Sequence, residues 1–168
     1  MESGTFAPVN LAWLDVLVRI GAAVILSLAL GVERYLRKKP IDFRPFVIIA
    51  LAASTLVIGV SEYGIKVDDS ALAVAPSRVV QGVLTGIGFI AAGALFREDH
   101  TVYGAGSATS IWAAGAIGLL CGFGLLWLAF LLAAGLLLTL VLSKPFTDEY
   151  TVRMDDEREE RQDKGKRK

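Results

Sequence analysis

Residues 78–112 read RVVQGVLTGIGFIAAGALFREDHTVYGAGSATSIW, two apolar runs rich in small residues on either side of a short charged break. Helices in lipid gain little hydrophobic energy by associating, so small side chains, which let two backbones approach closely, favour tight packing between them. The sequence therefore predicts that this segment is a helical hairpin at the packed centre of a membrane bundle.

The composition of the whole chain agrees with a membrane location. Of 168 residues 54% are apolar, and the mean hydropathy is +0.57. The 17 basic and 17 acidic side chains fall almost entirely outside the apolar runs, as in a multi-pass membrane protein. A net charge of zero gives no field that would attract nucleic acid. With one cysteine, Cys121, and one histidine, His100, neither a disulfide nor a Cys/His metal centre is expected, and no cofactor.

Five apolar runs are long enough to cross a hydrocarbon core as helices at roughly 1.5 Å per residue. They cover residues 11–32, 45–61, 79–96, 104–121 and 124–142. The predicted fold is an all-α, polytopic membrane bundle of about five transmembrane helices, formed by residues 1–143. Residues 144–168 carry eight basic and eight acidic side chains, so this tail is expected to be disordered or a solvated helix.

Basic residues predict the orientation of the bundle. The loop over residues 33–44 carries five of them, Arg34, Arg37, Lys38, Lys39 and Arg44. The positive-inside rule places this loop, Arg97 and the Lys-rich tail in the cytoplasm, and therefore the N-terminus outside. Because Met1 to Asn10 contains no basic residue, the first apolar run is expected to be a retained span of the inner (plasma) membrane rather than a cleaved signal.

Small residues at helical spacing predict two close-packing faces. Gly82 and Gly86 have the GxxxG spacing, and a second face repeats every four residues through Gly118 and Gly122. The residues predicted to serve helix packing are Gly82, Gly86, Gly88, Gly93, Gly104, Gly118 and Gly122.

Ionisable and amide side chains at membrane depth are functional candidates, because burying them in lipid is costly. The candidates are Asp15, Arg19, Glu33, Arg34, Arg37, Arg78 and Gln81. Asp15 and Arg19 are four residues apart and share a helical face. They form either a structural pair or interfacial anchor, or a site that faces the bundle interior. Gln81 either bonds across helices or meets water at the interface. No catalytic set of Ser, His and Asp is available, so no enzyme activity is predicted.

Three stretches, taken in order, resemble the MgtC/SapB family of bacterial and archaeal membrane proteins. The first, LGVERYLRKKP, matches a G-x-E-R-x-x-R-x-K-P pattern through Gly31, Glu33, Arg34, Arg37, Lys39 and Pro40. The second matches P-x-R followed by G-I-G-F-x-x-A-G through Pro76, Arg78, Gly86, Ile87, Gly88, Phe89, Ala92 and Gly93. The third matches V-x-G followed by Ala and Trp through Val102, Gly104, Ala108 and Trp112.

The chain also departs from that pattern. The acidic residue that the family commonly has before its Pro and Arg is Ala75 here, and the family's Gln four residues after that Arg is replaced by Gly82, with Gln81 one position earlier. A Thr pair in the fourth span corresponds to Gly106 and Ser107. We expect this to be a short form without the soluble C-terminal domain of longer members.

The resemblance implies a non-enzymatic inner-membrane protein linked to growth at low Mg²⁺ and, in pathogens, to virulence. Its implied partners are the lipid bilayer and a membrane complex, for which the F-type ATP synthase is the candidate, or further copies of the chain. The alternative is a small oligomeric ion transporter or channel. Its polar groups would come from Asp15, Arg19, Glu33, Arg78 and Gln81.

Overall fold

The computed structural model describes residues 7–37, 42–66, 76–98 and 101–143. In these residues the chain forms five helices and one short β-hairpin. The helices are α1 (Trp13–Leu36), α2 (Arg44–Lys66), α3 (Pro76–Gly93), α4 (Ala105–Gly122) and α5 (Leu126–Leu142). The predicted all-α fold with five helices is confirmed.

Three of these helices are long and apolar enough to cross a membrane: α1, residues Arg44–Gly64 of α2, and α4. The apolar helix α5 is shorter. The helix bounds differ from the predicted spans at α1, which continues past Val32 to Leu36. A charged residue ends an apolar run but not a helix, because Glu33 and Arg34 have good helical propensity.

The third predicted span, 79–96, is shifted. Helix α3 begins at Pro76, where the missing N–H of proline costs no helical hydrogen bond, and it ends at Gly93. The chain then enters strand β1 (Phe96–Glu98), which pairs antiparallel with β2 (Thr101–Tyr103). Gly104 follows with φ +85°, and an added Cβ there would collide with the carbonyl oxygen of Ala94. This hairpin was not predicted from the sequence.

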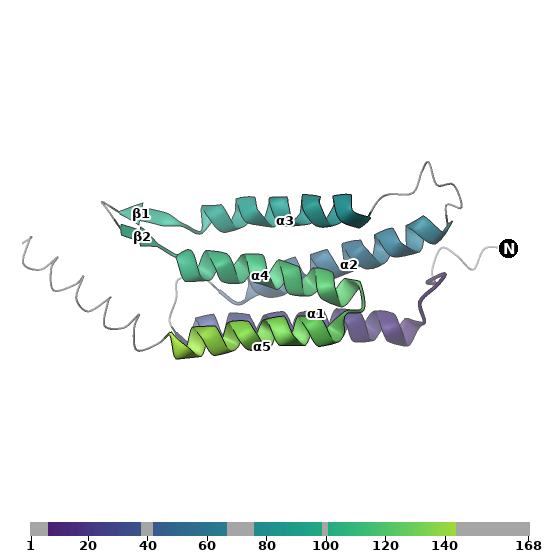
Figure 1. The fold of residues 1–168 in the computed structure, drawn as a ribbon, viewed down its shortest axis with the longest axis horizontal. Helices are drawn as coiled ribbons and strands as arrows, with labels where there is room; N and C mark the ends of the chain where they lie inside the picture. The colour runs from purple at the N-terminus through teal and green to yellow at the C-terminus, as the bar shows by residue number, and fades with distance from the viewer. Residues whose placement is uncertain (1–6, 38–41, 67–75, 99–100, 144–168) are drawn as a thin grey trace, which may run out of the picture. The chain divides into compact units, whose positions relative to one another are not determined.

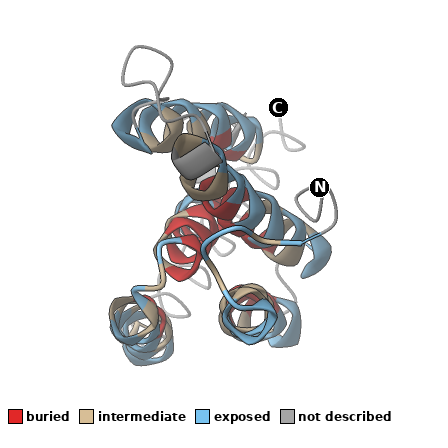
Figure 2. Ribbon diagram, turned by 90° about the vertical axis from the view of Figure 1, so that its right-hand side faces the viewer, coloured by how far each residue is buried: buried red, intermediate tan, exposed pale blue. Residues whose placement is uncertain are grey.

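The chain separates into two compact units, residues 1–134 and 135–168, and of the second the structure describes only residues 135–143. Within the first unit α4 is the central helix and contacts α1, α2 and α3 (Figure 1). Of the apolar stretch in α4, 67% of the residues are buried, against 33% in α2 and 22% in α1. Figure 2 shows the buried positions gathered in the middle, with exposed positions on the outer helix faces.

Helix α4 can take the centre because its sequence, AGSATSIWAAGAIGLLCG, consists mainly of small residues. Neighbouring helices can approach a thin helix from several sides, which maximises dispersion contact where no hydrophobic drive between helices exists. The outer helices instead expose large apolar side chains, among them Leu14, Leu17 and Ile25 of α1. Such side chains suit contact with lipid.

The first unit has two distinct ends. We call one the hairpin end, because it holds the β-hairpin, the end of α1 and the start of α2 (Figure 1). The other, the turn end, holds the start of α1, the end of α2 and the α4–α5 turn at residues 123–125. The described parts of the two loops predicted to be cytoplasmic, residues 33–37 with 42–44 and residues 97–98 with 101–103, lie at the hairpin end (Figure 1). Which side of a membrane this end faces stays a prediction.

Candidate functional site

The α2–α4 interface is a contact of backbone on backbone. A Cβ built at Gly118 would lie 2.7 Å from Cα of Ala50, and still closer to the Ala50 carbonyl oxygen. One helical turn later, a Cβ at Gly122 would lie 2.7 Å from the carbonyl oxygen of Ser54 and 2.8 Å from Cβ of Val57. Real Cβ atoms do not approach that closely, so both positions require glycine. The structure thus places two of the predicted packing glycines against α2.

Two further close approaches were missed by sequence reasoning. A Cβ at Gly115 would meet the end of the Ile87 side chain of α3, and one at Gly31 would lie 2.9 Å from Cβ of Phe43. The position of Gly31 in the motif LGVERYLRKKP was a usable signal, because glycine is otherwise unfavourable inside a helix.

The four glycines of α3 do not pack against the described part of the bundle. We expected Gly82, Gly86, Gly88 and Gly93 to lie in the packed centre, yet a Cβ at each would meet no described atom within 4 Å. The opposite, bulky face of α3 packs inward: Val80, Val83 and Leu84 lie against the core, and Ile87 and Ala91 are buried. The physical reason is that α4 supplies the small residues at this interface, so the neighbouring α3 fits by inserting large side chains.

The outward face of α3 is therefore both small and polar. Exposed residues on it include Arg78, Gln81, Thr85 and the glycines at 82 and 86. The hydroxyl of Thr85 donates to the carbonyl of Gln81 at 2.7 Å, within its own helix. Phe89, in the same helix, is 84% exposed. This face differs from the Leu- and Ile-rich outer faces that suit lipid.

Arg19 caps the end of α4. Its Nη1 donates to the carbonyl oxygen of Gly122 at 2.8 Å, and its Nη2 lies 2.9 Å from where a Cβ of Gly124 would be. The last carbonyls of a helix lack intrahelical partners and carry partial negative charge, which favours a cation. Gly124 has φ +79° and leaves room for the guanidinium. Asp15 is exposed and forms no ion pair with Arg19, which instead contacts the end of another helix.

A cluster of two arginines and one glutamate lies at the hairpin end, on the last turns of α1. Nε of Arg34 lies 2.9 Å from Oε2 of Glu33, and Arg37 pairs with the other oxygen of that carboxylate. The side chains of Arg34, Glu33 and Arg37 are 5%, 12% and 15% exposed. Arg34 also lies over the first turn of α4, its Nη1 being 3.1 Å from where a Cβ of Gly106 would be. We call these three residues the arginine cluster.

At the turn end Glu62 of α2 holds the segment that precedes α1. Its carboxylate accepts hydrogen bonds from the backbone N–H groups of Val9, Asn10 and Leu11, the last two at 3.1 Å. These donors lie ahead of the first helical turn and would otherwise depend on water. The span predicted over residues 45–61 ends one residue before Glu62, whereas α2 continues to Lys66 and includes it.

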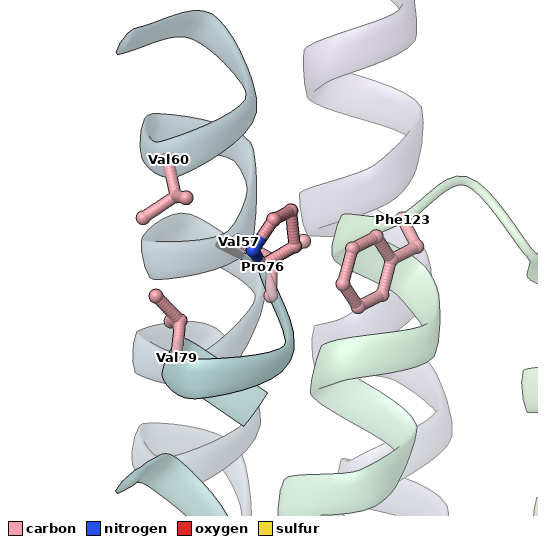
Figure 3. Close-up of a pocket in the computed structure, with 5 residues that line it drawn as sticks. All are labelled: Val57, Val60, Pro76, Val79 and Phe123. Carbon is pink, nitrogen blue, oxygen red and sulfur yellow. The ribbon is translucent and has the colours of Figure 1, made fainter. Parts of the chain in front are cut away.

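The part of the chain that the structure describes has a small apolar hollow but no group of side chains suited to a metal ion. A small hollow between α2, the start of α3 and the α4–α5 turn is lined by apolar side chains, namely Val57, Val60, Pro76, Val79 and Phe123 (Figure 3). Within residues 7–37, 42–66, 76–98 and 101–143, no three His, Cys, Asp or Glu side chains gather so that they could hold a metal ion.

Comparison with known proteins gives one family. The sequence model of the MgtC family matches residues 20–149, which include all five helices except the start of α1. Among relatives, the protein MgtC of Brucella abortus strain 2308 is 34% identical over 107 residues, 64% of this chain and 42% of the relative. No solved structure was found to match.

Two other relatives cover similar parts. YhiD of Escherichia coli K12, whose name makes it a candidate magnesium transporter, is 34% identical over 115 residues, 66% of this chain and 52% of YhiD. SapB of Bacillus subtilis strain 168 is 29% identical over 119 residues, 66% of this chain and 48% of SapB. The chain thus spans about half the length of the curated relatives it matches.

Proposed function

Because the chain belongs to the MgtC family, we propose that it is a non-enzymatic, multi-pass protein of the inner (plasma) membrane that contributes to Mg²⁺ homeostasis or to growth at low Mg²⁺. It acts by packing a helix face against a membrane partner. The names of the relatives support the link to magnesium, and three long apolar helices support the membrane location.

The observation that carries this proposal is the outer face of α3. Gly82 and Gly86 are exposed with open space beside them, next to the exposed Gln81. In lipid an exposed amide lacks a hydrogen-bond partner, and an exposed glycine pair gives up dispersion contact that a second helix would supply. A partner helix crossing at Gly86 would supply that dispersion contact.

The partner is a membrane complex, and the resemblance to the MgtC/SapB family makes the F-type ATP synthase the first candidate. A second copy of the chain is the other partner that the same face fits. Either partner would present a helix with a small-residue or complementary face at membrane depth.

The test is affinity purification of the tagged protein from its native membranes in mild detergent, after growth at low Mg²⁺. We expect mass spectrometry to identify a defined complex, and Gly86→Leu to abolish its recovery and the low-Mg²⁺ growth of a complemented deletion strain. The matched control is Gly59→Leu on α2, which is also exposed with open space beside it. Equal effects of both substitutions, or of neither, would contradict a specific role for α3.

The name of YhiD supports a second function, that of a small oligomeric ion transporter. Recovery of the protein alone as a discrete oligomer would favour this alternative. A Mg²⁺ flux assay in liposomes then decides it, with Asp15→Asn and Glu33→Gln as the variants expected to reduce flux.

A further inference from the structure

Arg34 is a charged side chain buried in a membrane protein, and only part of its guanidinium is engaged. The residue is 4% exposed, and Nε makes its ion pair with Glu33. Among the described residues, neither Nη1 nor Nη2 has a hydrogen-bond acceptor. A buried cation is normally surrounded by acceptors on all of its donors, because desolvating an unsatisfied one is costly. Nη1 and Nη2 are not among the fully buried unpaired atoms, so they are the accessible part of an otherwise enclosed side chain, where an acceptor group of a ligand can reach them.

Those open positions lie beside a second group of donors, the first turn of α4. Its N-cap residue Gly104 provides no side-chain cap, while the N–H groups of Ser107 and Ala108 donate to the Gly104 carbonyl. The N–H groups of Ala105 and Gly106 precede these and have no intrahelical acceptor. Nη1 of Arg34 lies 3.1 Å from the Cβ position of Gly106, so the two sets of donors converge.

Both sets of donors favour an anion over a cation. A guanidinium carries a full positive charge, and the N-terminus of a helix carries a partial one. A tetrahedral phosphate group, with several acceptor oxygens, matches the planar fork of an arginine better than a single-acceptor ion does. Ala105 and Gly106 are exposed, so a ligand can reach this point from outside the bundle.

The surroundings favour a phosphate that carries acyl chains. On the last turns of α1, beside the arginine cluster, Leu36 is 74% exposed, Tyr35 62% and Val32 39%. Leu28, one turn earlier, is exposed as well. These exposed side chains indicate that the end of α1 faces lipid, so a lipid whose phosphate binds at Arg34 would keep its acyl chains in the bilayer beside the bundle, a contact that a free phosphate ion lacks.

We propose that the arginine cluster and the first turn of α4 form a binding site for the headgroup phosphate of an anionic lipid. Arg34 supplies Nη1 and Nη2, the first turn of α4 supplies N–H groups, and Glu33 fixes the Arg34 guanidinium by holding its Nε. Arg37, on the same carboxylate, adds positive charge. The site does not depend on the partner that α3 binds.

The experiment is a titration of the delipidated, full-length protein in detergent, followed by native mass spectrometry. Phosphatidylglycerol, phosphatidylcholine and inorganic phosphate are the three probes. We expect saturable binding of phosphatidylglycerol, weaker binding of phosphatidylcholine, and no displacement of lipid by inorganic phosphate. Arg34→Gln should weaken phosphatidylglycerol binding about tenfold, the size expected for losing one charge-assisted contact. Arg44→Gln is the matched control, since it removes the same charge at the same end from a side chain that is 76% exposed.

A second variant keeps the test valid if Arg34→Gln fails to fold. Gly106→Ala retains every charge and adds a methyl group 3.1 Å from Nη1 of Arg34. We expect about threefold weaker binding from it, a loss smaller than that of a whole contact, and no change from Gly59→Ala, which adds a methyl to open space. Equal losses in Arg34→Gln and Arg44→Gln would show diffuse attraction and overturn the site. Displacement of lipid by inorganic phosphate, or equal binding of both lipids, would overturn the anionic-lipid assignment.

Discussion

Two glycines four residues apart occur both at the α2–α4 interface and on the outer face of α3, but among the described residues only the first pair is covered by another helix. On α4, Gly118 and Gly122 are four residues apart and lie against the backbone of Ala50 and Ser54. On α3, Gly82 and Gly86 are also four residues apart, and no described atom lies within 4 Å of a Cβ at either position. Small-residue spacing therefore identifies a face for close approach but not the helix that approaches it.

The difference separates two kinds of substitution. A larger residue on α4 must disturb the fold, because the neighbouring backbone cannot move away. A larger residue on α3 leaves the fold intact and disturbs only what binds there. Substitutions at the glycine pair of α4 should therefore change stability, whereas substitutions at the pair of α3 should change function.

The largest effect is expected from Gly118→Ala. The added methyl would collide with the Ala50 backbone, 2.7 Å from its Cα, and should lower the free energy of unfolding by about 3 kcal/mol. Unfolding in mixed detergent micelles with increasing dodecyl sulfate measures this. Gly115→Ala is the matched variant: its methyl meets the end of the flexible Ile87 side chain, so its cost should be about 1 kcal/mol. The same cost for both would contradict a rigid α2–α4 contact.

The next largest effect is expected at the end of α4, where Arg19 donates to the carbonyl of Gly122. Arg19→Gln removes the charged donor to the Gly122 carbonyl and should lower the free energy of unfolding by about 2 kcal/mol. Asp15→Asn should leave stability unchanged, because Asp15 is exposed and forms no ion pair with Arg19. A comparable loss from Asp15→Asn in the same unfolding assay would restore the Asp15–Arg19 pair and refute the helix cap.

A smaller effect, of opposite sign, is expected at Ser54. This residue is fully buried against α4, and its Oγ has no hydrogen-bond partner among the described residues. Ser54→Ala should raise the free energy of unfolding by about 1 kcal/mol, because it removes a desolvated hydroxyl from a small-residue contact. Ser27→Ala should not, since Oγ of Ser27 donates to the Ala23 carbonyl at 2.7 Å. Destabilisation by Ser54→Ala would show that the hydroxyl has an acceptor.

The smallest effect on folding is expected at the open face. Gly86→Ala adds a methyl where no described atom lies within 4 Å, and it should raise the free energy of unfolding by about 0.5 kcal/mol through lower backbone entropy in the unfolded chain. Thermal unfolding of the isolated protein measures this. If the same variant binds its membrane partner less well, the contrast between the two glycine pairs is sharpened. A marked loss of stability would instead place α3 inside the bundle.

Much of the fold could be predicted because apolar run length and charge placement follow directly from the bilayer as solvent. The errors have particular causes. Hydropathy marks where lipid begins rather than where a helix ends, so α1 continues through Arg34 to Leu36 while α3 ends at Gly93, although the next residues are apolar. The three-residue strands of the hairpin are too short for any periodicity to be visible in sequence.

The candidate site was harder to predict because its geometry depends on pairs of helices. Sequence reasoning selected Arg19 and Arg34 as polar residues at membrane depth, but their contacts at Gly122 and Gly106 lie on another helix. Likewise, the inward face of α3 is set by Gly115 of α4, into whose open side Ile87 fits. Such complementarity is a property of two segments together, and neither shows it alone.

The cap at the end of α4 has a consequence for folding during synthesis. Arg19 and its acceptor, the Gly122 carbonyl, are separated by 103 residues, so a ribosome adding about 5 to 20 residues per second makes the cation roughly 5 to 20 s before its acceptor. During that interval the first helix carries an unmatched charge at the insertion machinery. The hydrogen bond that caps α4 can therefore form only after the fourth helix has been synthesised.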